Sequence, residues 1–334
     1  SMADSFDLAY LYGRVCGTFS EAFLGAKGAA LSGTDDVASL WKIVFGDDPP
    51  DLPEALLLSE AEKKVIRRAL ARFDRLAAPF SEGDRFIAAL SRKVEFSDVK
   101  RVLAALHAGY PKPPGLVLGE GETEYHPDAW PDIAAMFSDS RYDWIDGNAV
   151  QEIAVSENHL DRQYYLELWA SLDTIPKARI GAIRELVSSE VLYQNLVWAL
   201  RLRRYYGYTR DQALPLLVIL PGADVEGPAL SCFDIDLDDP ASWSSWEWAR
   251  LSGGPAGMQA LDVGRFETAA QGELHRLVRK ALHFHPFTYT PLYCHFKLGE
   301  SEAALILGMF EGIRLGAPVQ ERLSYAWALA GEQV

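Results

Sequence analysis

The sequence has few cysteines and no long apolar run. It contains three cysteines, Cys16, Cys232 and Cys294, an odd number with no pair at metal-ligand spacing, which indicates a reducing compartment. The best candidates for an apolar span, at 213–220 and 303–310, fall well short of the ~20 residues that cross a bilayer. We therefore expect no membrane span in this chain.

Motifs of common catalytic sites are also missing. No Gly-Lys pair occurs, and the glycine-rich stretch 253–257 contains a proline and no following lysine, so it predicts a loop rather than a phosphate-binding site. No Gly-x-Ser-x-Gly motif marks a serine hydrolase. The acidic run 234–238 opens like a calcium loop, but Asp239 and Ser245 stand where that loop needs glycine and glutamate. We predict no nucleotide site, no catalytic metal site and no cofactor.

Histidines gather late in the chain. They stand at positions 275, 283, 285 and 295, and Cys294 precedes the last of them. Imidazole and thiolate suit zinc, but neither a paired-cysteine motif nor a His-Glu-x-x-His helix supports such a site. Structural packing roles are therefore favoured over a metal site for these histidines. A metal-dependent hydrolase that uses these histidines remains an alternative function.

Composition and charge indicate a folded, acidic protein. Hydrophobic residues make up 49% of the 334 residues and aromatic residues 11%, which argues against disorder. The net charge is −15, and such a surface repels phosphate backbones, so nucleic acid is not an expected partner. It favours partners that carry a basic surface.

Helical periodicity dominates the sequence. Apolar residues at 65, 66, 69, 70, 73 and 76 share one helical face, and Ser59 with Glu62 predicts a capping box before them. Thr209 and Gln212 have the same spacing, and residues 303–313 carry another apolar stripe. Strand-like runs at 216–220 and 233–237 are too short to build a sheet. We predict an all-α fold.

Two segments rich in glycine, proline and acids, 109–127 and 221–242, predict connections between helical parts. They divide the chain into 1–108, 109–220 and 221–334, with a linker at the start of the second and third parts. Each part contains a helix that is predicted to open near an acid and stop at a glycine: Asp98 to Gly109, Glu190 to Gly207, and Glu300 to Gly316. This pattern favours threefold duplication of one helical unit.

Two side-chain clusters could belong to an interface. Arg201, Arg203 and Arg204 end a predicted helix, where they either complement the helix dipole or form a basic contact for an acidic partner. Three tryptophans lie at 243, 246 and 248. Core packing is the default expectation for them, although an exposed one would be an interface anchor.

Four segments, in chain order, resemble the C-type subunit of the bacterial and archaeal V/A-type rotary ATPases, a family similar to the d-type subunit of eukaryotic vacuolar ATPases. They are YLYGRVCGTFSEAFLG at 10–25, ENHLDRQYYLELW at 157–169, YQNLVWALRLRRYYGYTRDQALPLLVILPGA at 193–223, and FTYTPLYCHFKLGESEAALILGMFEGIRLGAPVQERLSYAW at 287–327. The resemblance extends from about residue 8 to 327. Two departures are the extra residues between Lys297 and Glu300 and the unmatched stretch 243–257.

The resemblance implies three similar helical lobes in a pseudo-threefold funnel. It implies a non-catalytic central-stalk subunit that couples the rotating central shaft to the membrane proteolipid ring, for proton or sodium transport. The subunit would lie on the cytoplasmic face of the membrane and receive the foot of a coiled-coil shaft. Arg201, Arg203 and Arg204 are the partner-interface candidates. A helical-repeat scaffold for unrelated protein partners is the alternative, because it would share the fold and the lack of chemistry.

Overall fold

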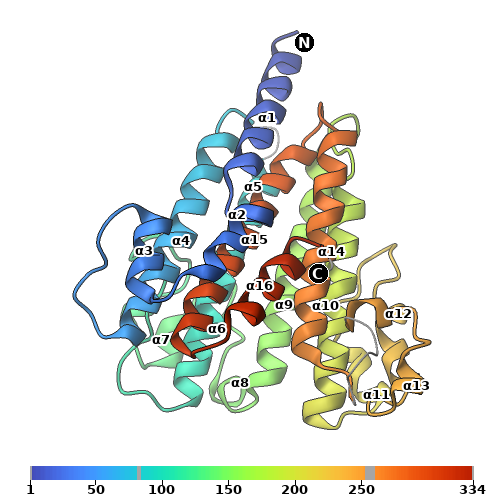
Figure 1. Cartoon of the computed structure of the whole chain (residues 1–334). Helices are drawn as coiled ribbons and strands as arrows, with labels where there is room; N and C mark the ends of the chain where they lie inside the picture. The colour runs from blue at the N-terminus through green and yellow to red at the C-terminus, as the bar shows by residue number, and fades with distance from the viewer. Residues whose placement is uncertain (1, 81–83, 253–259, 333–334) are drawn as a thin grey trace. The chain divides into compact units, whose positions relative to one another are not determined.

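A computed structural model describes residues 2–80, 84–252 and 260–332 (Figure 1). The predicted all-α fold is confirmed, since helices and no strand occur within these ranges. The nearest approach to a sheet there is an isolated bridge between Leu220 and Ala223. The glycine-rich stretch 253–257 lies outside the described residues.

The chain divides into two compact units, residues 1–82 with 175–334 (unit 1) and residues 83–174 (unit 2). Unit 1 contains α1 (Met2–Glu21), α2 (Gly25–Ala30), α3 (Val37–Phe45), α4 (Glu54–Ala77), α10 (Ile183–Tyr206), α11 (Arg210–Ala213), α12 (Gly227–Leu230), α13 (Pro240–Trp243), α14 (Val263–Phe284), α15 (Thr290–Arg314) and α16 (Val319–Leu329). Unit 2 contains α5 (Asp84–Ser91), α6 (Lys93–His107), α7 (Ile133–Phe137), α8 (Gly147–Gln151) and α9 (Ile153–Ser171). The predicted three lobes and their boundaries stay a prediction.

Helix α15 is the centre of unit 1. It packs against α1, α4, α14 and α16, and Figure 1 shows it between α4 and α14. Every residue from Thr290 to Leu298 is buried, because this half of the helix is covered on all sides rather than on one face. The apolar stripe predicted at 303–313 lies in the second half of the same helix.

Helices α14 and α16 approach each other closely at Gly272. A Cβ atom at this position would lie 1.8 Å from the carbonyl oxygen of Ala328, which is a backbone atom that cannot rotate away. We expect Gly272→Ala to lower the free energy of unfolding by about 3 kcal/mol, the upper end of the range for overpacking. Urea denaturation followed by circular dichroism measures this change.

The matched control is Gly13→Ala, in the exposed interior of α1, where a Cβ atom would meet no described atom within 4 Å. This substitution should raise the free energy of unfolding by about 1 kcal/mol, because alanine is the better helix former. Equal effects of the two substitutions would show that the α14–α16 contact is not tight.

The three predicted glycine stops are confirmed. Gly109, Gly207 and Gly316 have φ angles of 68°, 66° and 69°, in the left-handed region that glycine adopts without strain. They follow the ends of α6, α10 and α15.

The prediction that each of these helices opens near an acid is wrong. The helices begin five to ten residues earlier, so that Asp98, Glu190 and Glu300 lie inside them. Buried apolar residues continue upstream of each acid and extend the helix by packing. Asp98, fully buried, instead accepts hydrogen bonds from the backbone N–H groups of Val117 and Leu118 at 3.0 and 2.8 Å.

Asn195 of α10, like Asp98 of α6, binds the backbone of a later segment. Its amide donates to the carbonyl oxygen of Val218 at 2.8 Å and accepts from the N–H of Val218 at 2.9 Å. In both α6 and α10, therefore, a buried polar side chain binds the backbone of a segment that lies beyond the glycine stop. Duplication of a helical unit stays a prediction.

One of the two predicted capping boxes is correct. Thr209 and Gln212 form the reciprocal pair of hydrogen bonds at the start of α11. The Ser59–Glu62 box is wrong, because α4 begins earlier, at Glu54, directly after Pro53. Proline before a helix fixes φ near its helical value, and this start signal precedes the polar pair in the chain.

Of the predicted connections, 109–127 is irregular until a short 3-10 helix begins at Pro127. The second, 221–242, is more than a linker. It contains α12 and the start of α13, and it buries Leu230, Cys232 and Leu237 in the core around α10 and α14.

Candidate functional site

The three candidate arginines lie in the last two turns of α10, and each has a partner within the chain. Arg201 forms an ion pair with Glu267 of α14 at 2.6 Å. Arg203 donates a hydrogen bond to the carbonyl oxygen of Cys232. The cluster therefore holds α14 and the segment after α12 against α10, and its role as a partner interface stays a prediction.

Arg204 completes this set. Its guanidinium group forms an ion pair with Asp238 at 2.6 Å and donates to the carbonyl oxygen of Leu261 at 3.2 Å. Arg210 pairs in the same way with Asp234 at 2.9 Å. The acidic run that resembled a calcium loop is thus partly neutralised by arginines.

The three tryptophans pack in the core of unit 1, which confirms the prediction of core packing. Trp243, Trp246 and Trp248 are all buried. The indole N–H of Trp246 donates to the hydroxyl of Ser231 at 2.7 Å, and its ring stacks on Phe266. None of the three is exposed to serve as an interface anchor.

Two of the late histidines, His275 and His295, are buried against aromatic rings. His275 is buried and stacks on Phe19, and burial lowers its pKa to about 4. His295 is buried and stacks on Phe73, and burial likewise lowers its pKa to about 4. The neutral form of each is favoured because a buried imidazolium would lose its hydration.

Cys294 and the remaining cysteines do not add a metal site. The Cys294 thiol donates to the carbonyl oxygen of Val278 at 3.3 Å, and burial raises its pKa. Burial also raises the pKa of the Cys232 thiol to about 12. Among the residues that the structure describes, no three His, Cys, Asp or Glu side chains are placed to hold one metal ion.

A buried ion pair joins α10 to α15. The ammonium group of Lys297 lies 2.7 Å from one carboxylate oxygen of Glu190, and the hydroxyl of Tyr293 donates to the other at 2.5 Å. The side chains of Lys297 and Glu190 are 9% and 6% exposed. Glu300, one turn further along α15, also contacts the Lys297 ammonium group. Because both charges are buried, the pair and its neighbours Tyr293 and Glu300 together compensate them.

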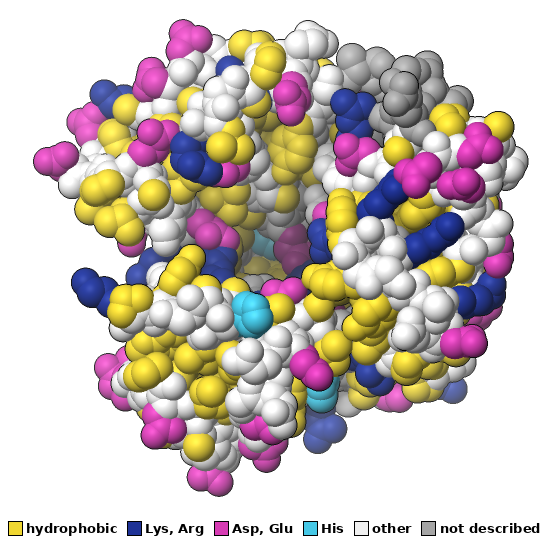
Figure 2. Space-filling model, turned by 90° about the horizontal axis from the view of Figure 1, so that it is seen from below, with side chains coloured by type: hydrophobic (Ala, Val, Ile, Leu, Met, Phe, Trp, Pro, Cys, Tyr) yellow, Lys and Arg dark blue, Asp and Glu magenta, His cyan; other side chains and the backbone are white. Residues whose placement is uncertain are grey.

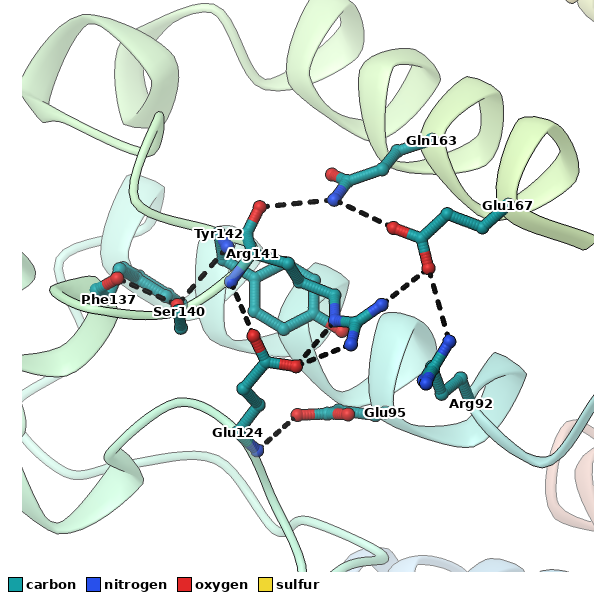
Figure 3. Close-up of polar contacts among 9 residues, drawn as sticks. All are labelled: Arg92, Glu95, Glu124, Phe137, Ser140, Arg141, Tyr142, Gln163 and Glu167. Atoms are coloured by element: carbon teal, nitrogen blue, oxygen red, sulfur yellow. Dashed lines mark hydrogen bonds and ion pairs between the residues drawn. The ribbon is translucent and has the colours of Figure 1, made fainter. Parts of the chain in front are cut away.

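A second polar network orders unit 2 around Arg141 (Figure 3). Its guanidinium group points at two carboxylates, contacting Glu124 at 2.6 Å and Glu167 of α9 at 2.5 Å. The amide of Gln163 donates to Glu167 and to the carbonyl oxygen of Arg141 at 3.2 and 3.1 Å. These bonds fix the irregular segment around Glu124 and Arg141 on α9.

The same segment is fixed on α6 by Glu95, which accepts the backbone N–H of Glu124 at 2.6 Å (Figure 3). Burial raises the pKa of Glu95. The ring of Phe96 contacts the buried ring of Tyr142 edge to face. Polar bonds and aromatic packing together attach the segment to two helices of unit 2.

The described residues on the face drawn in Figure 2 do not form a single acidic patch. Acidic side chains are scattered there among basic and hydrophobic ones. The net charge of −15 belongs to the whole chain and would steer a basic partner. The charges on this face do not define where such a partner docks.

Most of the chain matches a known protein family. Residues 45–325 match the protein family described as ATP synthase (C/AC39) subunit. The chain belongs to this family. The match runs from the end of α3 into α16 and so spans residues of both compact units.

This C/AC39 family chain also has a relative of similar length. It is 27% identical over 322 residues to a protein of Treponema pallidum (strain Nichols) described as uncharacterized, covering 92% of this chain and 93% of that protein. The shared length shows that the similarity extends across the chain rather than through one motif.

Within the described part of this C/AC39 family chain, no helix combines the length and the apolar character needed to cross a membrane.

The Glu190–Lys297 pair is the feature that sequence reasoning missed. Both residues stood in recognised segments, but they lie 107 positions apart, and a single sequence carries no sign that they pair. Covariation between the two positions in many C/AC39 sequences is the signal that could have found them.

Proposed function

We propose that this chain is a non-catalytic central-stalk subunit of a V/A-type ATPase or ATP synthase. In this role it couples the rotating central shaft to the membrane proteolipid ring, and the complex transports protons or sodium ions. The observation that carries the proposal is the match of residues 45–325 to the ATP synthase (C/AC39) subunit family.

The packing of unit 1 supports a mechanical role. A coupling protein needs a stiff body, and closely packed helices transmit strain. The central helix α15 is covered along its first half, and the buried Glu190–Lys297 pair joins it to α10. These features resist sliding of α10 along α15.

The proposal includes location and partners. The protein would lie peripherally on the cytoplasmic face of the membrane, with the central shaft on one surface and the proteolipid ring on another. Three lobes in a pseudo-threefold funnel remain the proposed arrangement, supported by the three glycine stops at 109, 207 and 316. Within this proposal, Arg201, Arg203 and Arg204 are candidates for one of the contacts.

Reconstitution tests both the function and the arginine cluster. We expect the purified chain to bind the shaft proteins and the proteolipid ring of the same organism. Arg203→Glu with Arg204→Glu should weaken one of these two interactions at least about tenfold, the effect expected of interface arginines, and leave the other unchanged. Biolayer interferometry with each partner measures the two affinities.

Circular dichroism controls for folding in this test, because both arginines also bind residues of the chain itself, namely Cys232, Asp238 and Leu261. Unchanged affinities for both partners would show that the cluster is only structural. If the unmodified chain binds neither shaft nor ring, the coupling role is wrong, and a scaffold for unrelated proteins becomes the better account.

A further inference from the structure

Unit 2 is inserted into unit 1. The chain passes from unit 1 into unit 2 between residues 82 and 83 and returns between residues 174 and 175, so two segments of chain join the units. Compact units of one chain commonly move relative to each other. The places where the two joining segments are held decide which motion is available.

Tyr289, the residue before α15, holds both joining segments within unit 1. Its ring meets the ring of Phe80 edge to face, with the ring centroids 5.7 Å apart. Its backbone N–H donates to the carbonyl oxygen of Arg179 at 2.7 Å. Phe80 precedes the entry into unit 2 and Arg179 follows the return. One buried residue therefore contacts the chain on both sides of the insertion.

Thr290 extends this anchor. Its hydroxyl is fully buried and accepts the backbone N–H of Ala182 at 3.0 Å. It also lies 2.9 Å from the hydroxyl of Thr288. The two hydroxyls leave no room for a Cβ atom at Gly181, whose φ of 52° is in the left-handed region. Residues 179–182 are therefore fixed on the start of α15.

The joining segments are also neighbours within unit 2. Helix α5 follows the entry, and the 3-10 helix η4 (Leu172–Thr174) precedes the return. These two elements pack against each other. The two segments are therefore close together in each unit, on Tyr289 in unit 1 and at the contact of α5 with η4 in unit 2.

An exposed turn lies between η4 and the anchor. Ile175 is buried, whereas Pro176, Lys177 and Ala178 are exposed. The backbone N–H of Arg179 donates to the carbonyl oxygen of Pro176 at 2.7 Å and closes a β-turn. A short exposed turn between two fixed points can change its backbone dihedral angles without disturbing a packed core.

We propose that unit 2 rotates as a body relative to unit 1 on this double connection. Tyr289 and Thr290 are the fixed part of the hinge, and the turn 176–179 is the part that changes conformation. Because two adjacent connections allow less freedom than one, the motion is a rotation about the line that joins them. Hinges need only a few residues at the ends of secondary-structure elements. The inference goes beyond the proposed function and does not depend on it, because it concerns how the chain joins its own units.

Distances between spin labels on the full chain test the hinge. Cys16, the partly exposed cysteine, is first replaced by serine. One label pair joins the units, at the exposed positions Gln271 of α14 and Ala104 of α6, and a reference pair joins Gln271 to the exposed Glu60 of α4 within unit 1. Double electron–electron resonance should give a broader distance distribution for the pair between units than for the reference pair.

Two variants should change that distribution in opposite directions. Lys177→Pro should narrow it, because the second position of a β-turn accepts proline and the proline ring fixes φ. Thr290→Val should broaden it, because valine keeps the shape of threonine but loses the hydroxyl that binds Ala182. Neither variant should change the distribution of the reference pair.

Thr268→Val is the matched control for the loss of a hydroxyl. The Thr268 hydroxyl donates to the carbonyl oxygen of Gly264 within α14 at 3.1 Å, away from both joining segments in the sequence. This variant should leave the distribution between units unchanged. Circular dichroism checks the helix content of every variant, and Lys177→Pro decides the question if Thr290→Val fails to fold.

Two results would overturn the inference. If the unmodified chain gives a distribution between units as narrow as that of the reference pair, the two units form one rigid body and the hinge is wrong. If the distribution is broad but Lys177→Pro leaves it unchanged, the turn 176–179 is not the part that moves, and the proposed hinge is again rejected.

Discussion

We expect Lys297→Met to lower the free energy of unfolding by about 3 to 5 kcal/mol. Methionine fills much of the same space, but it leaves the Glu190 carboxylate buried in unit 1 without the cation that lies 2.7 Å away. Breaking a buried ion pair from one side carries a cost of this size, because the remaining charge has lost its hydration and its partner. Urea denaturation at neutral pH measures the change.

Two further variants sharpen this test. Lys297→Met combined with Glu190→Gln should recover part of the lost stability, since the charge of the more deeply buried carboxylate is removed together with its cation. Arg314→Met breaks the exposed pair between Arg314 and Glu311 and should leave the denaturation midpoint unchanged. If the single Lys297 variant is as stable as the original chain, the buried pair does not hold α10 on α15.

Acidification between pH 6.5 and 4 should destabilise the fold through its two buried histidines. In the folded chain burial lowers the pKa of His275 and of His295 to about 4, whereas the unfolded chain protonates them near 6.5. The folded state therefore binds fewer protons, and its stability contribution is complete above pH 6.5 and is lost as the pH falls towards 4. At about 1.4 kcal/mol for each pH unit, each histidine contributes about 3 kcal/mol to this loss.

Substitution separates the histidines from the carboxylates that also titrate in acid. His275→Leu with His295→Leu should make the free energy of unfolding fall less steeply between pH 6.5 and 4.5. His126→Leu, at an exposed histidine, should leave the slope unchanged. A double variant with the original slope would mean that the two imidazoles are hydrated in the folded chain.

The sequence predicted features that depend on neighbours along the chain. The glycine stops at 109, 207 and 316 were correct because a left-handed residue at a helix end is a local requirement. The Thr209–Gln212 box was correct for the same reason, since its atoms lie within one turn. The Ser59–Glu62 box failed because Pro53, an equally local signal, begins α4 earlier.

The candidate interface shows where such reasoning ends. The arginines at 201, 203 and 204 were recognised as a cluster, and their position at a helix end was correct. Their partners come from residues 232–267, which a helix-end pattern does not reveal.

The sequence by itself determined the all-α class, the absence of common catalytic motifs and the resemblance to the family to which the chain belongs, since each follows from periodicity, composition or ordered motifs. Tertiary structure decided which charges are buried and paired. Glu190 and Lys297 lie 107 residues apart, and only the packing of α10 beside α15 brings them within 2.7 Å. The physical reason is that burial and ion pairing depend on distances in space, which the linear order of residues does not specify.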